Sequence, residues 1–179
     1  MQGMGEQSMG EAAPAPLLAD CYAQMRRTAR RMMAREPDLW LQPTDLAHEA
    51  VIRLMGLHRM DVNDRGHMLA LAARVMRQAM IDEFRRARSA KRQVPNTLTS
   101  WPGSTRKVEL DVLDDALRAL AEVSAEHAEI VELRFSLGLT VEETAAATGT
   151  TARTIKRRWQ AARTWLQHYL ETDGTAVCA

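Results

Sequence analysis

The chain has 179 residues, a formal net charge of +1 and an aromatic content of 4%. Such a length holds one domain or two small ones, because single domains commonly have roughly 100 to 150 residues. Strand-forming residues are scarce and Ala, Leu, Met, Arg and Glu dominate, so the composition predicts an all-α protein without a sheet. The small net charge alone argues against a nucleic-acid partner, so the distribution of the charges decides that question.

Basic residues gather in two blocks, at 74–92 and 153–163, and carboxylates gather between them at 109–132. Screened attraction acts over about 10 Å or less, so each block acts on what lies near it. The pattern suits a protein that meets phosphate with some faces and a protein partner with others. A single run of charge is also typical of a solvated helix face, so the blocks need support from a motif.

The N-terminal residues and the cysteines exclude several classes of protein. Residues 1–16 are rich in Gly, Gln, Ala and Pro and have no apolar segment, which predicts a disordered tail rather than a signal peptide. Cys21 and Cys178 lie far apart without a CxxC spacing, so no metal site, cofactor or disulfide framework is indicated. No run approaches the roughly 20 apolar residues of a membrane helix, which predicts a cytoplasmic protein.

Apolar residues recur at helical spacing over 17–35, 44–57 and 67–90, which predicts three helices. Thr44 is the predicted N-cap of the second helix, and the turn-rich segment 61–66 precedes the third. These helices form a first predicted domain at 17–92. Over 93–108 the pattern lapses into Pro, Asn, Thr, Ser and Gly, with Trp101 as an unusual bulky residue, which predicts a flexible, semi-extended linker.

The predicted second domain, at 109–171, has four helices at about 110–123, 124–137, 140–148 and 151–170, and 172–179 is a polar tail. Gly138 closes the second of these helices. Thr140 and Glu143 form a capping box that opens the third, and Gly149 ends it. The fold class is therefore all-α, with two small helical domains joined by a linker.

The segment 138–159 has the layout of a helix-turn-helix. Ile155 and Trp159 bury the second helix of the motif against the first, which leaves the other positions free to face DNA. A recognition helix meets base edges and phosphates with its first turns. The DNA-binding candidates are Thr151, Arg153, Thr154, Lys156, Arg157 and Arg158. A basic amphipathic helix in an ordinary bundle is the alternative.

The first domain carries a further pattern. The segment 45–54, Asp-Leu-Ala-His-Glu-Ala-Val-Ile-Arg-Leu, resembles a signature of region two in the ECF-type (group 4) sigma factors of the sigma-70 family. This resemblance implies that the helix packs on the clamp helices of the largest subunit of RNA polymerase. Asp45, His48, Glu49 and Arg53 are then the polymerase-facing residues. It further implies a contact of region four with the flap of the second-largest subunit, and an anti-sigma factor as a further partner.

The segment 73–86 resembles the part of these factors that recognises and opens the minus-10 promoter element. The loop 59–65 lies where the family holds a flipped base, which costs a few kcal/mol to extract. Asp82 falls at the usual acidic position, where a structural ion pair is expected. The minus-10 candidates are Asn63, Asp64, Arg74, Arg77, Gln78, Arg85 and Arg86. The second domain then reads the minus-35 element, and the chain directs promoter-specific initiation.

Other classes remain open at this point. His48-Glu49 begins like an HExxH zinc motif, but Ile52 stands where the second His is needed. Asp111, Asp114 and Asp115 suit magnesium, yet such spacing is usually a solvated helix face. We therefore expect no catalytic residues. The main alternative is a dimeric helix-turn-helix regulator that does not depend on core polymerase, and an adaptor with basic faces is a third.

Overall fold

The computed structural model describes residues 15–34, 41–56, 64–91, 98–101 and 107–172. Across these residues it has seven α-helices, one short π-helix and one two-stranded sheet. The all-α fold class is therefore confirmed. Residues 1–14 and 173–179 of the predicted tails, and the loop that contains Asn63, lie outside the described residues.

The first three helices form one bundle: α1 (Ala15–Met33), α2 (Pro43–Met55) and α3 (Arg65–Lys91). Each turns an apolar stripe inward, and Met25, Leu54 and Met68 are among the fully buried side chains. Gln42, rather than the predicted Thr44, is the N-cap of α2. Pro43 follows it at the first helical position, where its missing N–H leaves no orphan donor, and the backbone N–H of Gln42 donates to Asp45 Oδ2 at 3.4 Å.

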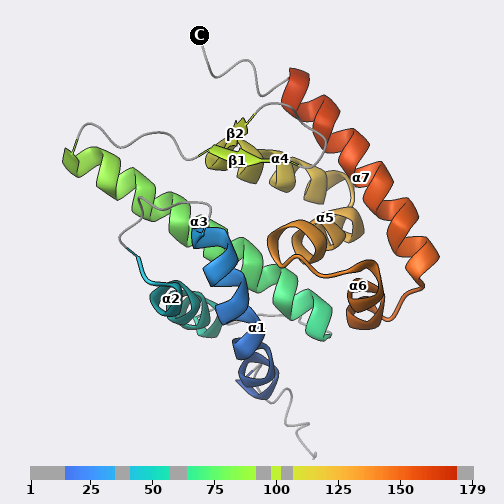
Figure 1. Cartoon of the computed structure of the whole chain (residues 1–179), viewed down its shortest axis with the longest axis horizontal. Coiled ribbons are helices and arrows are strands. Elements are labelled where there is room, and N and C mark those ends of the chain that lie inside the picture. The colour runs from blue at the N-terminus through green and yellow to red at the C-terminus, as the bar shows by residue number, and fades with distance from the viewer. Residues whose placement is uncertain (1–14, 35–40, 57–63, 92–97, 102–106, 173–179) are drawn as a thin grey trace, which may run out of the picture.

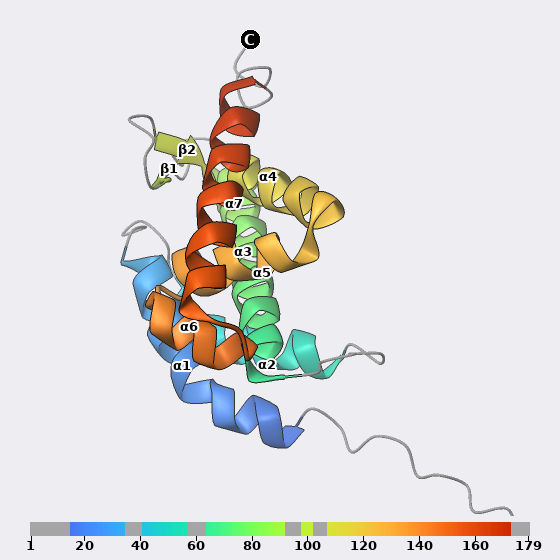
Figure 2. The ribbon, with the colours of Figure 1, turned by 90° about the vertical axis from the view of Figure 1, so that its right-hand side faces the viewer.

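The C-terminal half comprises α4 (Leu110–Val123), α5 (Ala125–Val131), the π-helix η1 (Glu132–Ser136), α6 (Val141–Thr148) and α7 (Ala152–Thr172). Ser124 caps α5 through a hydrogen bond from the His127 backbone N–H. Leu113, Leu117 and Leu166 are buried in a second core. Figure 2 shows α7 running along the outside of this half, where it contacts α4, α5 and α6.

The predicted linker is partly structured. Strands β1 (Leu98–Ser100) and β2 (Lys107–Glu109) pair antiparallel, so the expectation of no sheet was wrong. The Trp101 side chain is 2% exposed and lies in the second core, with its ring centroid 5.0 Å from that of Phe135 and 6.0 Å from that of Trp159. Because this large ring is buried there, the end of β1 is attached to the C-terminal half and cannot move as a flexible linker would.

The two halves are packed together instead of lying apart. Figure 1 shows α3 crossing the middle of the molecule, with α1 and α2 on one side and α4 and α5 on the other. Leu110, Leu133 and Leu137 of the C-terminal half are buried in the core formed by the first three helices. The segments predicted as separate domains therefore share a buried contact.

Candidate polymerase and DNA interfaces

The helix-turn-helix is formed by α6 and α7. Thr140 Oγ1 accepts a hydrogen bond from the Glu143 backbone N–H at 3.1 Å, and Glu143 Oε2 accepts one from the Thr140 N–H at 2.7 Å. These two bonds satisfy donors that a helix start leaves free, and they confirm the predicted capping box. Gly149 has a φ of 63°, which a glycine adopts without strain, so the predicted turn is also confirmed.

The side chains of α7 divide between core and solvent as the motif predicts. Ile155 is fully buried, and Trp159 is half-buried against Trp101. Arg153, Lys156 and Arg157 are exposed on the first two turns. Three cations on one exposed helix face suit contact with a phosphate backbone and with base edges in the major groove.

The remaining recognition-helix candidates have local partners. Thr151 is exposed and caps α7, because its Oγ1 accepts from the Thr154 backbone N–H at 3.2 Å. Arg158 is half-buried, and its Nη2 lies 2.6 Å from Glu126 Oε2 of α5. This ion pair directs Arg158 toward the body of the protein rather than toward solvent.

On α3 the candidate residues differ in their availability. Arg74, Arg85 and Arg86 are exposed. Asp64 is exposed and stands before the helix, where its Oδ1 accepts a hydrogen bond from the His67 backbone N–H at 2.7 Å. That bond satisfies one of the free donors at the start of α3, so Asp64 has a capping function whatever else it does.

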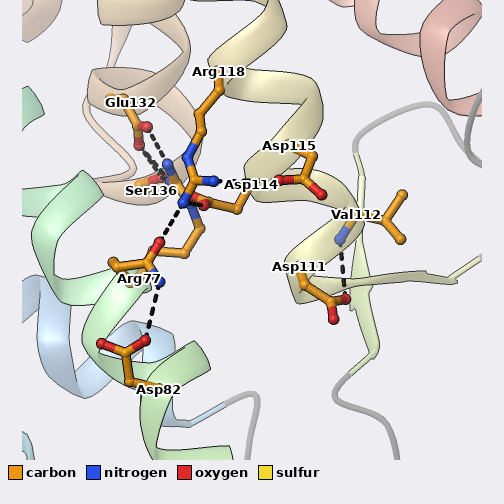
Figure 3. Close-up of polar contacts among 10 residues, drawn as sticks. Arg77, Asp82, Asp111, Val112, Asp114, Asp115, Arg118, Glu132 and Ser136 are labelled. Atoms are coloured by element: carbon orange, nitrogen blue, oxygen red, sulfur yellow. Dashed lines mark hydrogen bonds and ion pairs between the residues drawn. The ribbon is translucent and has the colours of Figure 1, made fainter. Parts of the chain in front are cut away.

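Arg77 does not lie on a DNA-accessible face in this arrangement. Its side chain is 2% exposed, and its guanidinium group lies 2.8 Å from Asp114 and 2.6 Å from Glu132 (Figure 3). The neighbouring Gln78 is half-buried and donates to Asp82 at 3.1 Å. The helical spacing of the basic residues did identify the face of α3, but it could not show that α4 and η1 cover part of that face.

The carboxylates hold Arg77 in its charged form. Burial alone would lower the pKa of this guanidinium, because removal from water disfavours the charge. The Coulombic attraction and hydrogen bonds of Glu132 and Asp114 outweigh this effect and raise the pKa above its ordinary value. Arg77, Asp114 and Glu132, named here the Arg77 triad, therefore form a buried cluster of two ion pairs.

On α2, the residues predicted to face polymerase lie on two sides of the helix. Asp45 and His48 are exposed, and the His48 ring stacks on Tyr22 of α1 with a centroid distance of 5.6 Å. Arg53 lies 2.8 Å from Glu49 and 3.0 Å from Asp82 of α3. The contact between Arg53 and Asp82 confirms the structural ion pair predicted for Asp82.

The pKa of the Asp82 carboxyl group reflects this contact. Partial burial would raise it, but hydrogen bonds from Gln78 and Arg53 outweigh burial and lower the pKa below its ordinary value. Arg53 therefore supports the packing of α2 on α3, and its guanidinium group is only partly available to a partner.

Comparison with known proteins identifies the family. A family model described as ECF sigma factor matches residues 6–172. The chain belongs to the ECF sigma factor family. No curated protein sequence matches it. One solved structure that resembles it is the sigma factor RpoE in complex with the anti-sigma factor NepR from Bartonella quintana, with 20% sequence identity, a TM-score of 0.37, and coverage of 89% of this chain and 95% of that chain.

As a sigma factor, this protein acts with RNA polymerase in transcription initiation. Within the described residues no helix has the length and apolar character needed to cross a membrane. The same residues contain no cluster of three or more His, Cys, Asp or Glu side chains placed to hold a metal ion. In particular, Asp114 of the acidic segment forms an ion pair with Arg77.

The structure adds two residues to the candidate polymerase face of this sigma factor. Ile52 and Met55 are each 66% exposed, which is unusual for large apolar side chains. They continue the helical stripe of Asp45 and His48, because positions 45, 48, 52 and 55 share one face of a helix. The sequence signal was available, since Ile52 and Met55 interrupt the polar side of an amphipathic helix.

Proposed function

We propose that this sigma factor binds core RNA polymerase through α2 and reads the minus-35 and minus-10 promoter elements through α7 and α3. The observation that supports it best is a pair of exposed surfaces on separate helices. One is the basic face of α7, formed by Arg153, Lys156 and Arg157, and the other is the apolar stripe of α2, formed by Ile52 and Met55. The first suits DNA and the second suits protein. A dimeric regulator would use the same two kinds of surface, so binding to core polymerase is the property that separates the two functions.

In this proposal Arg153, Lys156 and Arg157 contact the minus-35 element, with Thr151 and Thr154 beside them. Arg74, Arg85 and Arg86 of α3 contact the minus-10 region, and Arg77 and Gln78 do so when the two halves of the chain separate. Ile52 and Met55 insert between side chains of the clamp helices of the largest subunit, because a few well-packed side chains contribute most of the binding free energy of an interface. The flap of the second-largest subunit contacts the helix-turn-helix half, and an anti-sigma factor competes for these surfaces.

The test is reconstitution of the full chain with bacterial core RNA polymerase. We expect a one-to-one complex that initiates at specific sites on genomic DNA. Ile52→Glu should weaken the complex with core, whereas Val123→Glu should not, although both side chains are 66% exposed in the free protein. Equal binding by the two variants would contradict the role of α2.

A second pair of variants, one on α7 and one control on α1, tests the DNA-reading role. Arg157→Ala should reduce initiation without loss of core binding, and Arg30→Ala, which removes an exposed arginine from α1, should leave both unchanged. A chain that fails to bind core and instead dimerises on a palindromic site would be a helix-turn-helix regulator.

A further inference from the structure

Arg77 joins the two halves of the chain through a cluster of directional contacts. Its Nη1 and Nη2 donate to the two carboxylate oxygens of Glu132 at 2.8 and 2.6 Å, and its Nε donates to Asp114 at 2.8 Å. Figure 3 shows these partners converging on the guanidinium group from α4 and η1. A bidentate pair with a third charged contact fixes position and orientation together.

All three members of the Arg77 triad are removed from water, since Arg77, Asp114 and Glu132 are between 2% and 3% exposed. The π-helix η1 supports this geometry, because Ser136 Oγ donates to Glu132 Oε2 at 2.7 Å within the same turn. Arg118 of α4 extends the contact to α3 by pairing with Asp114 and donating to Gln78. Two neighbouring minus-10 candidates, Arg77 and Gln78, are thus held by the C-terminal half.

The covering of functional surfaces is selective. The basic face of α7 and the apolar stripe on α2 remain exposed, and so do Arg74, Arg85 and Arg86 of α3. Among the minus-10 candidates that the structure describes, Arg77 and Gln78 are the ones that the C-terminal half covers. In the closed arrangement the chain can therefore contact polymerase and minus-35 DNA, while Asp114 and Glu132 cover the minus-10 candidate Arg77.

The chemistry of the triad suits a contact that opens. The carboxylate of Glu132 offers Arg77 the bidentate acceptors that a DNA phosphate also offers, and Asp114 adds a single acceptor for Nε. When the halves separate, all three charges return to water together, so no buried charge is left without a partner. An apolar contact of equal size would hold more firmly, because buried ion clusters are often no more stabilising than well-packed apolar side chains.

We propose that the Arg77 triad is an autoinhibitory contact: it holds the free sigma factor closed, with acidic side chains in the place of promoter DNA, until the halves separate on polymerase. The apolar contact through Leu133 and Leu137 draws the halves together, and the triad sets the arrangement in which they meet. The promoter-reading role of Arg77 rests on the proposed function, but the closed state of the free chain does not.

The closed state can be measured as a distance in the full chain. Spin labels at Ala23→Cys on α1 and Ala161→Cys on α7, both exposed positions, report the separation of the halves by pulsed electron paramagnetic resonance. Cys178→Ser removes one native thiol, and Cys21 stays because it is buried. We expect one short, narrow distance distribution for this background. A broad distribution at long distance in the background itself would overturn the proposal.

The decisive variant is Asp114→Asn with Glu132→Gln, which leaves the Arg77 charge buried without a counter-ion and should shift the distribution to longer distances. Asp115→Asn with Glu122→Gln is the matched control, because it removes exposed carboxylates of α4, and it should keep the short distance. If the decisive variant loses its helical circular dichroism, Asp114→Asn alone supplies the test and should open partially. An unchanged short distance in the folded variant would overturn the proposal.

A second readout separates the two proposals. With core polymerase, Asp114→Asn with Glu132→Gln should form open promoter complexes faster than the wild-type chain, a gain that simple structural damage would not produce. Slower or equal opening by this folded variant would contradict the autoinhibitory role. If the distances respond as expected but the wild-type chain does not bind core, the proposed function fails and the closed state stands.

Discussion

The basic faces of α7 and α3 differ in what lies opposite them. On α7, Arg153, Lys156 and Arg157 face solvent, whereas on α3 Arg77 faces two carboxylates at hydrogen-bonding distance. Both faces have arginines at helical spacing. Spacing therefore places a charge on a face of a helix, whereas tertiary packing sets the partner of that charge.

The arginines of the two faces also differ in how much they contribute to the free energy of unfolding. An exposed arginine contributes little to folding, because water solvates it in both the folded and the unfolded chain. A buried arginine with two carboxylates is different, since loss of one member removes a counter-charge from a group that stays buried. Substitutions on the two faces should therefore separate into effects on binding and effects on stability.

The largest effect is expected at the buried face. Arg77→Ala should lower the free energy of unfolding by about 3–5 kcal/mol, because Glu132 is left as an uncompensated buried charge and Asp114 keeps only its ion pair with Arg118. Arg74→Ala, one turn earlier and exposed, should change it by no more than about 0.5 kcal/mol. Chemical denaturation followed by circular dichroism measures both. Similar values for the two variants would mean that the halves do not share this contact in solution.

A smaller loss of stability is expected at Trp101, where the segment predicted as a linker contacts α7. Trp101→Ala should cost about 3 kcal/mol, the lower end for a buried tryptophan, because Phe135 and Trp159 can move into part of the space. The loss should appear in denaturation of the full chain and should be accompanied by weaker minus-35 binding, since Trp159 lies on the recognition helix. A variant as stable as the wild-type chain would restore the view of 93–108 as a simple linker.

The sequence predicted well those features that depend on neighbouring residues. The capping box of Thr140 and Glu143, the turn at Gly149 and the inward side of α7 all follow from local spacing, and the structure confirms them. It could not predict the burial of Arg77, because its partners Asp114 and Glu132 stand 37 and 55 residues away. Trp101 was noted as unusual in a linker, but its burial depends on Phe135 and Trp159, which are equally remote in the chain.

Substitutions on the exposed face of α7 should weaken DNA binding and leave the stability of the free chain unchanged. The triple change Arg153→Gln, Lys156→Gln and Arg157→Gln should reduce the slope of log affinity against log salt by about 0.9 for each lost phosphate contact. Titration of a minus-35 duplex with the holoenzyme at several salt concentrations measures this slope. The melting temperature of the free chain should stay close to that of the wild type. An unchanged slope would remove α7 from the DNA interface.

The smallest effect is expected at Glu129 on α5, close to where α5 packs against α3. Partial burial raises the pKa of its carboxyl group above the ordinary value, despite the attraction of His67 and Arg158. The contribution of this group to stability is therefore fully present below the unfolded pKa and is lost as the pH rises through the folded pKa.

Glu129→Gln should raise the melting temperature slightly at pH 7, where the wild-type chain keeps a carboxylate in this partly desolvated place. The gain should shrink as the pH is lowered toward about 4, because the wild-type carboxyl group then becomes neutral as well. A gain that does not change with pH would show that packing, rather than charge, distinguishes this position from the exposed face of α7.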